Sequence, residues 1–154
     1  MKIKEQLENE LKSLERELRV DLPREIGRAR EHGDLKENAE YHAAKERQSF
    51  VNARVSQLKL RLGELSRIRV EDISKDKAGL GSLLKVLDLA DDKEVHYEIV
   101  MAEEADPKIG KISITSPLGK GFMGRGVGEE VSIQVPSGMR SYEIVSLKTI
   151  HERE

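Results

Sequence analysis

Residues 33–46 read GDLKENAEYHAAKE and separate two long segments with helical periodicity. In each segment the apolar residues recur in steps of three or four, which places them in one narrow stripe on an otherwise charged helix. Two such stripes are typical of an antiparallel two-helix coiled coil, so residues 33–46 predict the tip of a helical hairpin. At ~1.5 Å per residue, helices of about 30 residues give an arm of roughly 45 Å. The stripe residues are Ile3, Leu7, Leu11, Leu14, Leu18 and Leu22 before the tip, and Val51, Val55, Leu58, Leu62, Leu65 and Ile68 after it.

The tip carries two acids, Asp34 and Glu37, for which the sequence allows two interpretations. Gly33 can end a helix in a left-handed conformation, and Asp34 followed three residues later by Glu37 has the pattern of a capping box that begins the next helix. Capping contributes about 1 kcal/mol and would account for both acids. The other interpretation is that the carboxylates act on a partner, because the apex of a thin hairpin is solvated and adds little to a core.

Basic residues gather behind the tip, and the sequence allows two interpretations of this basic collar. Such a collar would let the arm approach phosphates while its carboxylates face something cationic. The alternative is that these side chains only solubilise the two helices. The collar residues are Arg24, Arg28, Arg30, Lys45 and Arg47.

Asp34 and Glu37 also have the chemistry of a shared magnesium site. Magnesium prefers octahedral oxygen ligands and is usually held by one or two carboxylates together with waters and substrate phosphates. Side chains three residues apart at the start of a helix are close enough to ligate one ion, although two exposed carboxylates alone bind it weakly. We therefore expect no metal bound by this chain on its own, and a Mg²⁺ site completed by a partner. In a two-metal phosphodiester reaction, the second ion orients and activates the attacking water.

The extent of the arm follows from where the helical pattern changes. Pro23 lies inside the first segment, where proline removes a backbone donor, so we expect the helix to be bent or interrupted near residues 21–23. Beyond residues 71–76 the helical pattern stops. The sequence therefore predicts two domains, a coiled-coil hairpin with an acidic tip at residues 1–74 and a globular domain at residues 75–154.

The second domain reads as a small α+β fold. Short apolar and β-branched runs alternate with turn signals, which predicts an antiparallel sheet, and residues 117–125 predict one short helix. The glycines at 119 and 121 match neither phosphate-binding loop pattern, so we interpret them as packing positions. The predicted strands cover residues 83–87, 95–100, 111–115, 131–135 and 142–147.

Composition narrows the class of protein. Of the 154 residues 36% are charged and 3% are aromatic, which suits an elongated helical part beside a modest core. The formal net charge of −2 argues against a simple polycation that coats nucleic acid, and the absence of cysteine excludes disulfides and thiolate metal sites. No apolar stretch reaches the ~18 residues of a membrane span. We expect a soluble cytoplasmic protein without membrane association.

Residues 29–46, which include the tip, closely resemble the coiled-coil tip signature of the bacterial Gre transcript cleavage factors, of the GreA type in particular. Residues 114–119, 124–131, 136–138 and 142–144 are similar to the C-terminal domain of that family, which has an FKBP-like fold. The resemblance spans nearly the whole chain in the right order. Residues 19–27 match the family pattern poorly, which leaves the length and bend of the arm open.

The resemblance implies a mechanism. A Gre-like factor docks its globular domain at the rim of the RNA polymerase secondary channel and inserts the coiled coil toward the active centre. In a backtracked complex the tip acids help to hold the second Mg²⁺ and the attacking water, and the polymerase cleaves its own transcript. Asp34 and Glu37 would then be the catalytic carboxylates of an accessory factor that is not itself an enzyme. The resemblance also implies a monomer that meets the nascent RNA 3′ end only indirectly.

Further site residues carry over from the same resemblance. Ser116 and Pro117 form the turn that is expected to bind the polymerase. Arg30, Asn38 and Tyr41 are expected to support the tip or to contact the partner.

Two other functions compete with the catalytic accessory. One is a polymerase-channel regulator, like the anti-Gre relatives, that binds without stimulating cleavage. The other is a plain interaction module with no role in chemistry. The intact acids of the tip favour the catalytic accessory over the channel regulator. Both alternatives predict that Asp34→Asn with Glu37→Gln leaves the main activity unchanged.

Overall fold

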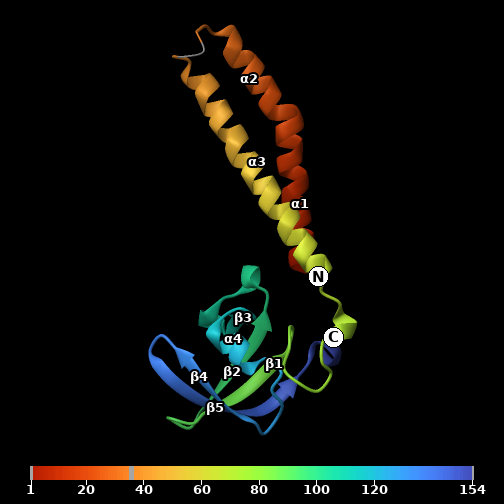
Figure 1. The fold of residues 1–154 in the computed structure, drawn as a ribbon, viewed down its shortest axis with the longest axis vertical. Helices are drawn as coiled ribbons and strands as arrows, with labels where there is room; N and C mark the ends of the chain where they lie inside the picture. The colour runs from red at the N-terminus through yellow and green to blue at the C-terminus, as the bar shows by residue number, and fades with distance from the viewer. Residues whose placement is uncertain (1, 35–36, 154) are drawn as a thin grey trace. The chain divides into compact units, whose positions relative to one another are not determined.

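The computed structural model describes residues 2–34 and 37–153, which form two compact units, Met1–Ile68 and Arg69–Glu154. The first unit is a helical hairpin and the second is built around a β-sheet (Figure 1). The expected fold class, an antiparallel two-helix arm followed by a small α+β domain, is confirmed. The elements are α1 (Lys2–Arg16), a π-helical segment (Glu17–Asp21), α2 (Leu22–Glu31), α3 (Ala39–Ser66), β1 (Leu83–Asp88), β2 (Lys93–Val100), β3 (Lys111–Ser113), α4 (Pro117–Phe122), β4 (Glu130–Val135) and β5 (Gly138–Lys148), with 3₁₀ turns at Val70–Asp72, Ala102–Glu104, Pro107–Ile109 and Ile150–Glu152.

The hairpin is held by the apolar stripe that the sequence predicts. Leu22, Val51 and Val55 are buried together, and further leucines of the first helix pack against them. Ion pairs flank this seam: Arg54 of α3 binds Glu10 of α1 through two hydrogen bonds of 2.7 and 2.9 Å. Because the two helices bury only each other, the arm is thin and its outer faces stay charged. The leucines packed against the seam are Leu11, Leu14 and Leu18.

The first helix is bent near Pro23 but is not interrupted. Asp21 and Leu22 keep right-handed helical backbone angles, and the Leu22 N–H donates to the Glu17 carbonyl, five residues back. Proline has no N–H and its ring crowds the carbonyl four residues earlier, so a wider π turn before Pro23 accommodates it without ending the helix. Figure 1 shows the helix changing direction between α1 and α2.

Two glycines inside the helices of the arm offer a stability test. Gly27 of α2 and Gly63 of α3 are exposed, and a Cβ built on either meets no atom within 4 Å. Glycine inside a helix costs roughly 0.5–1 kcal/mol relative to alanine, so Gly27→Ala and Gly63→Ala should each raise the free energy of unfolding by about that amount. Urea denaturation followed by helical circular dichroism measures it. Gly33→Ala is the contrasting variant, because Gly33 has φ +125°; a gain there as large as at Gly27 would contradict the structure.

The second unit has a mixed sheet, not the antiparallel sheet expected from the sequence. Within the described residues the strands run in the order β3-β2-β1-β5-β4, and β2 pairs with β3 in parallel, with Glu98 opposite Lys111. The 3₁₀ turns between β2 and β3 carry the chain back alongside β2, so that β3 starts again in the same direction. The other neighbouring pairs are antiparallel.

One face of the sheet carries the core of this unit. Phe122 of α4 is fully buried there, and its ring lies 5.8 Å from that of Tyr97 and 5.5 Å from that of Tyr142. Burial raises the pKa of Tyr97 to about 12. The predicted helix at residues 117–125 is confirmed in the shorter form of α4, which covers this face. The aliphatic core residues are Leu84, Val86, Ile99, Ile112, Val131, Ile133 and Ile144.

Candidate functional site at the tip of the hairpin

The tip begins where α2 ends. The His32 N–H donates to the Ala29 carbonyl at 3.1 Å, and Gly33 then takes φ +125°, a conformation that favours glycine and turns the chain away from the helix. Asp34 follows outside any helix or strand, and Glu37 lies in a turn before α3. Both acids are exposed, whereas Leu35 and Lys36 lie outside the described residues. The two carboxylates are therefore presented by the loop between the helices.

Asn38, and not Asp34, caps the second helix. Asn38 has an extended backbone (φ −85°, ψ 99°) directly before α3, and its Oδ1 accepts the Tyr41 N–H at 3.0 Å. The predicted capping box of Asp34 and Glu37 is therefore wrong. The physical reason is position: a cap must stand within three residues of the N–H groups that it binds, and Asn38 is an equally strong capping residue placed next to the first turn.

A second hydrogen bond joins Asn38 to the other helix. Its Nδ2 donates to the carbonyl of Ala29, which is buried in the last turn of α2. That carbonyl also accepts the His32 N–H, so both of its lone pairs are used. One side chain thus ties the end of α2 to the beginning of α3.

An open hollow at the tip brings several of the predicted site residues together. Asp34, Glu37 and Asn38 line it. The carboxylates of Asp34 and Glu37 supply the oxygen ligands that magnesium prefers, so these donors fit the expected ion. Among residues 2–34 and 37–153, no group of three or more His, Cys, Asp or Glu side chains is placed to hold a metal ion. The remaining lining residues are His32, Ala39 and Glu40.

Two lining residues were not singled out by the sequence. His32 and Glu40 flank the acids, and Glu40 also lines a second pocket further along the arm. Reading Asp34 as the helix start put Glu40 in the body of the helix, whereas it stands in the first turn of α3. A sequence prediction with Asn38 as the helix cap would have placed Glu40 in the first turn of the second helix, next to the tip.

The two other tip residues expected from the sequence lie beside this hollow. Arg30 is exposed in the last turn of α2. Tyr41 is partly buried in the first turn of α3, where its ring meets that of His42 edge to face at 5.8 Å. Neither side chain lines the hollow with Asp34 and Glu37.

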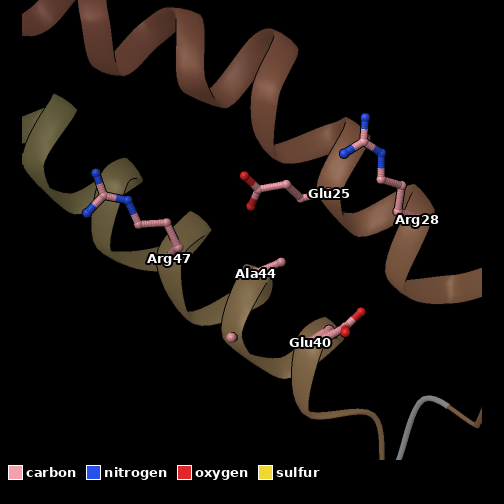
Figure 2. A pocket seen from close by; sticks show the side chains of 6 residues that line it. Glu25, Arg28, Glu40, Ala44 and Arg47 are labelled. Carbon is pink, nitrogen blue, oxygen red and sulfur yellow. The ribbon is translucent and has the colours of Figure 1, made fainter. Parts of the chain in front are cut away.

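The region behind the tip has mixed charge, in contrast to the basic collar that was one of the two interpretations of the sequence. Arg47 is bound to Glu17 of the π-helical segment through hydrogen bonds of 2.7 and 3.0 Å, and its guanidinium lies 5.2 Å from the centre of the Phe50 ring. Figure 2 shows the Glu25 carboxylate extending from α2 into the pocket between α2 and α3. Acidic side chains such as Glu25 and Glu17 therefore lie among the basic side chains of this region. The residues around this pocket are Glu25, Arg28, Glu40, Ala43, Ala44 and Arg47.

Acidification is expected to weaken the arm through its ion pairs. The hydrogen bonds from Arg47 lower the pKa of Glu17 below its ordinary value of 4.5, and Arg54 lowers the pKa of Glu10 in the same way. A carboxyl with a lowered folded-state pKa gives stability that is complete above the ordinary pKa and is lost as the pH falls through the folded-state value. Wild type should therefore lose more thermal stability than Glu17→Gln between about pH 6 and about pH 3.

Differential scanning calorimetry at each pH measures this difference, which should be modest because the pairs are exposed and screened. Glu46→Gln, which removes an exposed acid of α3 outside these two ion pairs, is the matched control and should follow wild type. Equal losses in wild type and Glu17→Gln would show that the ion pair does not stabilise the arm.

Comparison with known proteins identifies the family. The model "Transcription elongation factor, N-terminal" matches residues 2–67, and "Transcription elongation factor, GreA/GreB, C-term" matches residues 73–149. This chain belongs to the GreA/GreB family. It is therefore a transcription elongation factor, the class of protein that acts on RNA polymerase, and the resemblance seen in the sequence is confirmed.

Relatives in the GreA/GreB family match over almost their full length. Transcription elongation factor GreA of Acidiphilium cryptum is 45% identical over 92% of this chain and 90% of its own, and that of Trichlorobacter lovleyi is 44% identical over 94% and 91%. Among solved structures, GreA factor homolog 1 of Thermus thermophilus is 27% identical over 94% of this chain and 93% of its own, with a TM-score of 0.43.

The predicted docking residues of this GreA/GreB family chain lie in its second unit. Ser116 caps α4: its Oγ accepts the Gly119 N–H at 3.1 Å and donates to the Ser113 carbonyl at 2.7 Å. Pro117 follows as the first residue of the helix and is exposed. The turn is thus fixed to the end of β3, with the proline ring on the surface.

No helix in the described part of the chain is long and apolar enough to cross a membrane.

Proposed function

We propose that this elongation factor inserts its hairpin into the secondary channel of RNA polymerase and stimulates endonucleolytic cleavage of backtracked nascent RNA, which rescues arrested complexes. The observation that carries the proposal is the position of Asp34 and Glu37: both are exposed at the end of a thin arm and neither caps a helix. Their placement suits delivery of carboxylates into a partner.

In this proposal the factor is an accessory and the polymerase active centre performs the reaction. A water attacks the phosphorus of the transcript and loses a proton, the P–O3′ bond breaks, and the leaving 3′ oxygen takes up a proton. The upstream RNA then ends in a 3′-hydroxyl, and the released fragment begins with a 5′-phosphate. Asp34 and Glu37 would hold a Mg²⁺ shared with the polymerase, and would orient the attacking water. When bound, such an ion supplies charge stabilisation and lowers the pKa of its water.

Docking would be the task of the second unit. Ser116 and Pro117 present a turn that is held to β3 because the Ser116 hydroxyl and the Ser116 N–H both donate to the Ser113 carbonyl, so the turn is available to a partner without rearrangement. A monomer suffices, because the proposed tip and docking turn both belong to one chain. The nascent RNA 3′ end would be reached only through the polymerase.

The direct test uses halted RNA polymerase complexes that have backtracked, with and without the protein, across a magnesium titration. Release of short 3′ fragments and resumed extension of the 5′ part are expected only with the protein, with a lower magnesium requirement. Competition with nucleotide addition without any fragment release would contradict the proposal and would favour a channel-binding regulator. No effect on the complex at all would leave a plain interaction module.

A further inference from the structure

We propose that Asn38 is a positioning residue that fixes the loop carrying Asp34 and Glu37 by bridging the two helices of the arm. The inference rests on the proposed function, since it concerns how the tip acids are held for cleavage. Its basis is the pair of hydrogen bonds made by one amide: Nδ2 donates to the Ala29 carbonyl, and Oδ1 accepts the Tyr41 N–H at 3.0 Å.

The bridge closes the tip loop at its base. Ala29 and Asn38 are nine residues apart in the chain, and the acids lie between them. Closing a loop removes conformations that its residues would otherwise sample. The bridge therefore narrows the range of positions open to the two carboxylates.

Narrow placement matters because the acids lie outside both helices. The hydrogen-bond ladder of α3 begins after Asn38, so it does not orient Asp34 or Glu37. When a catalytic group acts by its position, a displacement of that group by about 1 Å can lower the rate ~100-fold. A loop that drifts on this scale would still enter a partner but would seldom align the two acids.

Asparagine suits the bridge because its side-chain amide carries a donor, Nδ2, and an acceptor, Oδ1, on two different atoms. Aspartate keeps the acceptor for the Tyr41 N–H but brings a negative charge against the Ala29 carbonyl in place of the donor. Serine can cap the helix but is one heavy atom shorter, so its hydroxyl does not span both partners. Alanine loses the cap and the bridge together.

The first experiment uses the free protein and needs no polymerase. Amide hydrogen exchange at Tyr41 reports the cap, and NMR relaxation of the Asp34 and Glu37 amides reports the order of the loop. In Asn38→Ser the Tyr41 amide should stay protected while the loop order falls, and in Asn38→Ala both should be lost. Unchanged loop order in Asn38→Ser and Asn38→Ala would overturn the bridge.

The second experiment separates positioning from binding in backtracked complexes. Asn38→Ser should lower the cleavage rate at saturating factor by roughly 10- to 100-fold, with the half-saturating concentration changed less than about twofold. Asn38→Asp should show a loss of the same kind. Val55→Ala, which thins the buried seam away from the tip, is the matched control: it should lower thermal stability and keep the full cleavage rate.

The two experiments distinguish a failure of this inference from a failure of the proposed function. If wild type stimulates cleavage and Asn38→Ser retains its full rate, the positioning role is wrong while the proposed function stands. If wild type stimulates no cleavage, the proposed function fails. The bridge is then judged by the relaxation data alone, where equal order in wild type and Asn38→Ser overturns it.

Discussion

Replacing Asp34 with alanine should abolish stimulated transcript cleavage while leaving the affinity for RNA polymerase almost unchanged. The loss should be at least ~100-fold in rate at saturating factor, which is typical when one group that stabilises developing charge is removed from an active centre. Glu37→Ala should have an effect of the same order. Fragment release from backtracked complexes measures the rate, and a binding titration on the same complexes measures the affinity.

This experiment isolates chemistry because Asp34 is not a helix cap. Its substitution costs no cap hydrogen bond of α3, so the helical content and thermal stability of the arm should stay close to those of wild type. Glu46→Gln removes an exposed acid from α3 and is the matched control, which should keep the full rate. Reduced affinity with an intact rate per bound factor would show that the tip acids bind and do not act in cleavage.

Replacing Gly119 with alanine should destabilise the second unit by more than about 3 kcal/mol, because this variant forces an atom into occupied space. A Cβ on Gly119 would lie 1.9 Å from the Ser113 carbonyl oxygen, and the obstacle is backbone that cannot swing away. Either α4 or the end of β3 must move. Because Ser116 and Pro117 begin α4, the proposed docking turn should be lost and the affinity for polymerase should fall with it.

Two measurements check this result. The aromatic rings in the core of the second unit give a near-ultraviolet circular dichroism signal, whose urea midpoint should drop in Gly119→Ala. Gly126→Ala is the matched control, because its Cβ would meet nothing closer than a carboxylate oxygen of Glu129 at 3.5 Å, an ordinary contact. Equal midpoints for Gly119→Ala and Gly126→Ala would mean that α4 does not sit against Ser113 as described.

The arm could be predicted from the sequence because its packing has a simple period. Residues such as Leu22 and Val51 recur with helical spacing, and burial of one stripe leaves little choice of partner. The helix start at the tip could not be predicted in the same way. Asp34 and Asn38 are both good caps, and only the three-dimensional course of the loop decides which of them stands next to the first free N–H groups.

The direction of β3 and the π-helical geometry before Pro23 could not be predicted from the sequence either. The alternation that marks residues 111–115 as a strand is the same for either direction, so the parallel pairing of β3 with β2 depends on the path of the connecting turns. The π-helical segment depends on how the backbone before Pro23 adapts to crowding, which no side-chain period records. The tip acids and Asn38 were both named from the local tip motif and its family resemblance, whereas the hydrogen bond from Asn38 to the Ala29 carbonyl of the other helix is seen only in the structure.

The separation of the tip acids from the helix cap has a consequence for how such proteins diversify. A substitution that removes the chemistry of Asp34 or Glu37 leaves intact the hydrogen bond by which Asn38 caps α3. Active and inactive forms of the arm are thus neighbours in sequence space, joined by steps that are nearly neutral for the fold. At Asp34 and Glu37, selection on activity can act without changing the cap of α3, whereas at Asn38 the two kinds of selection are coupled.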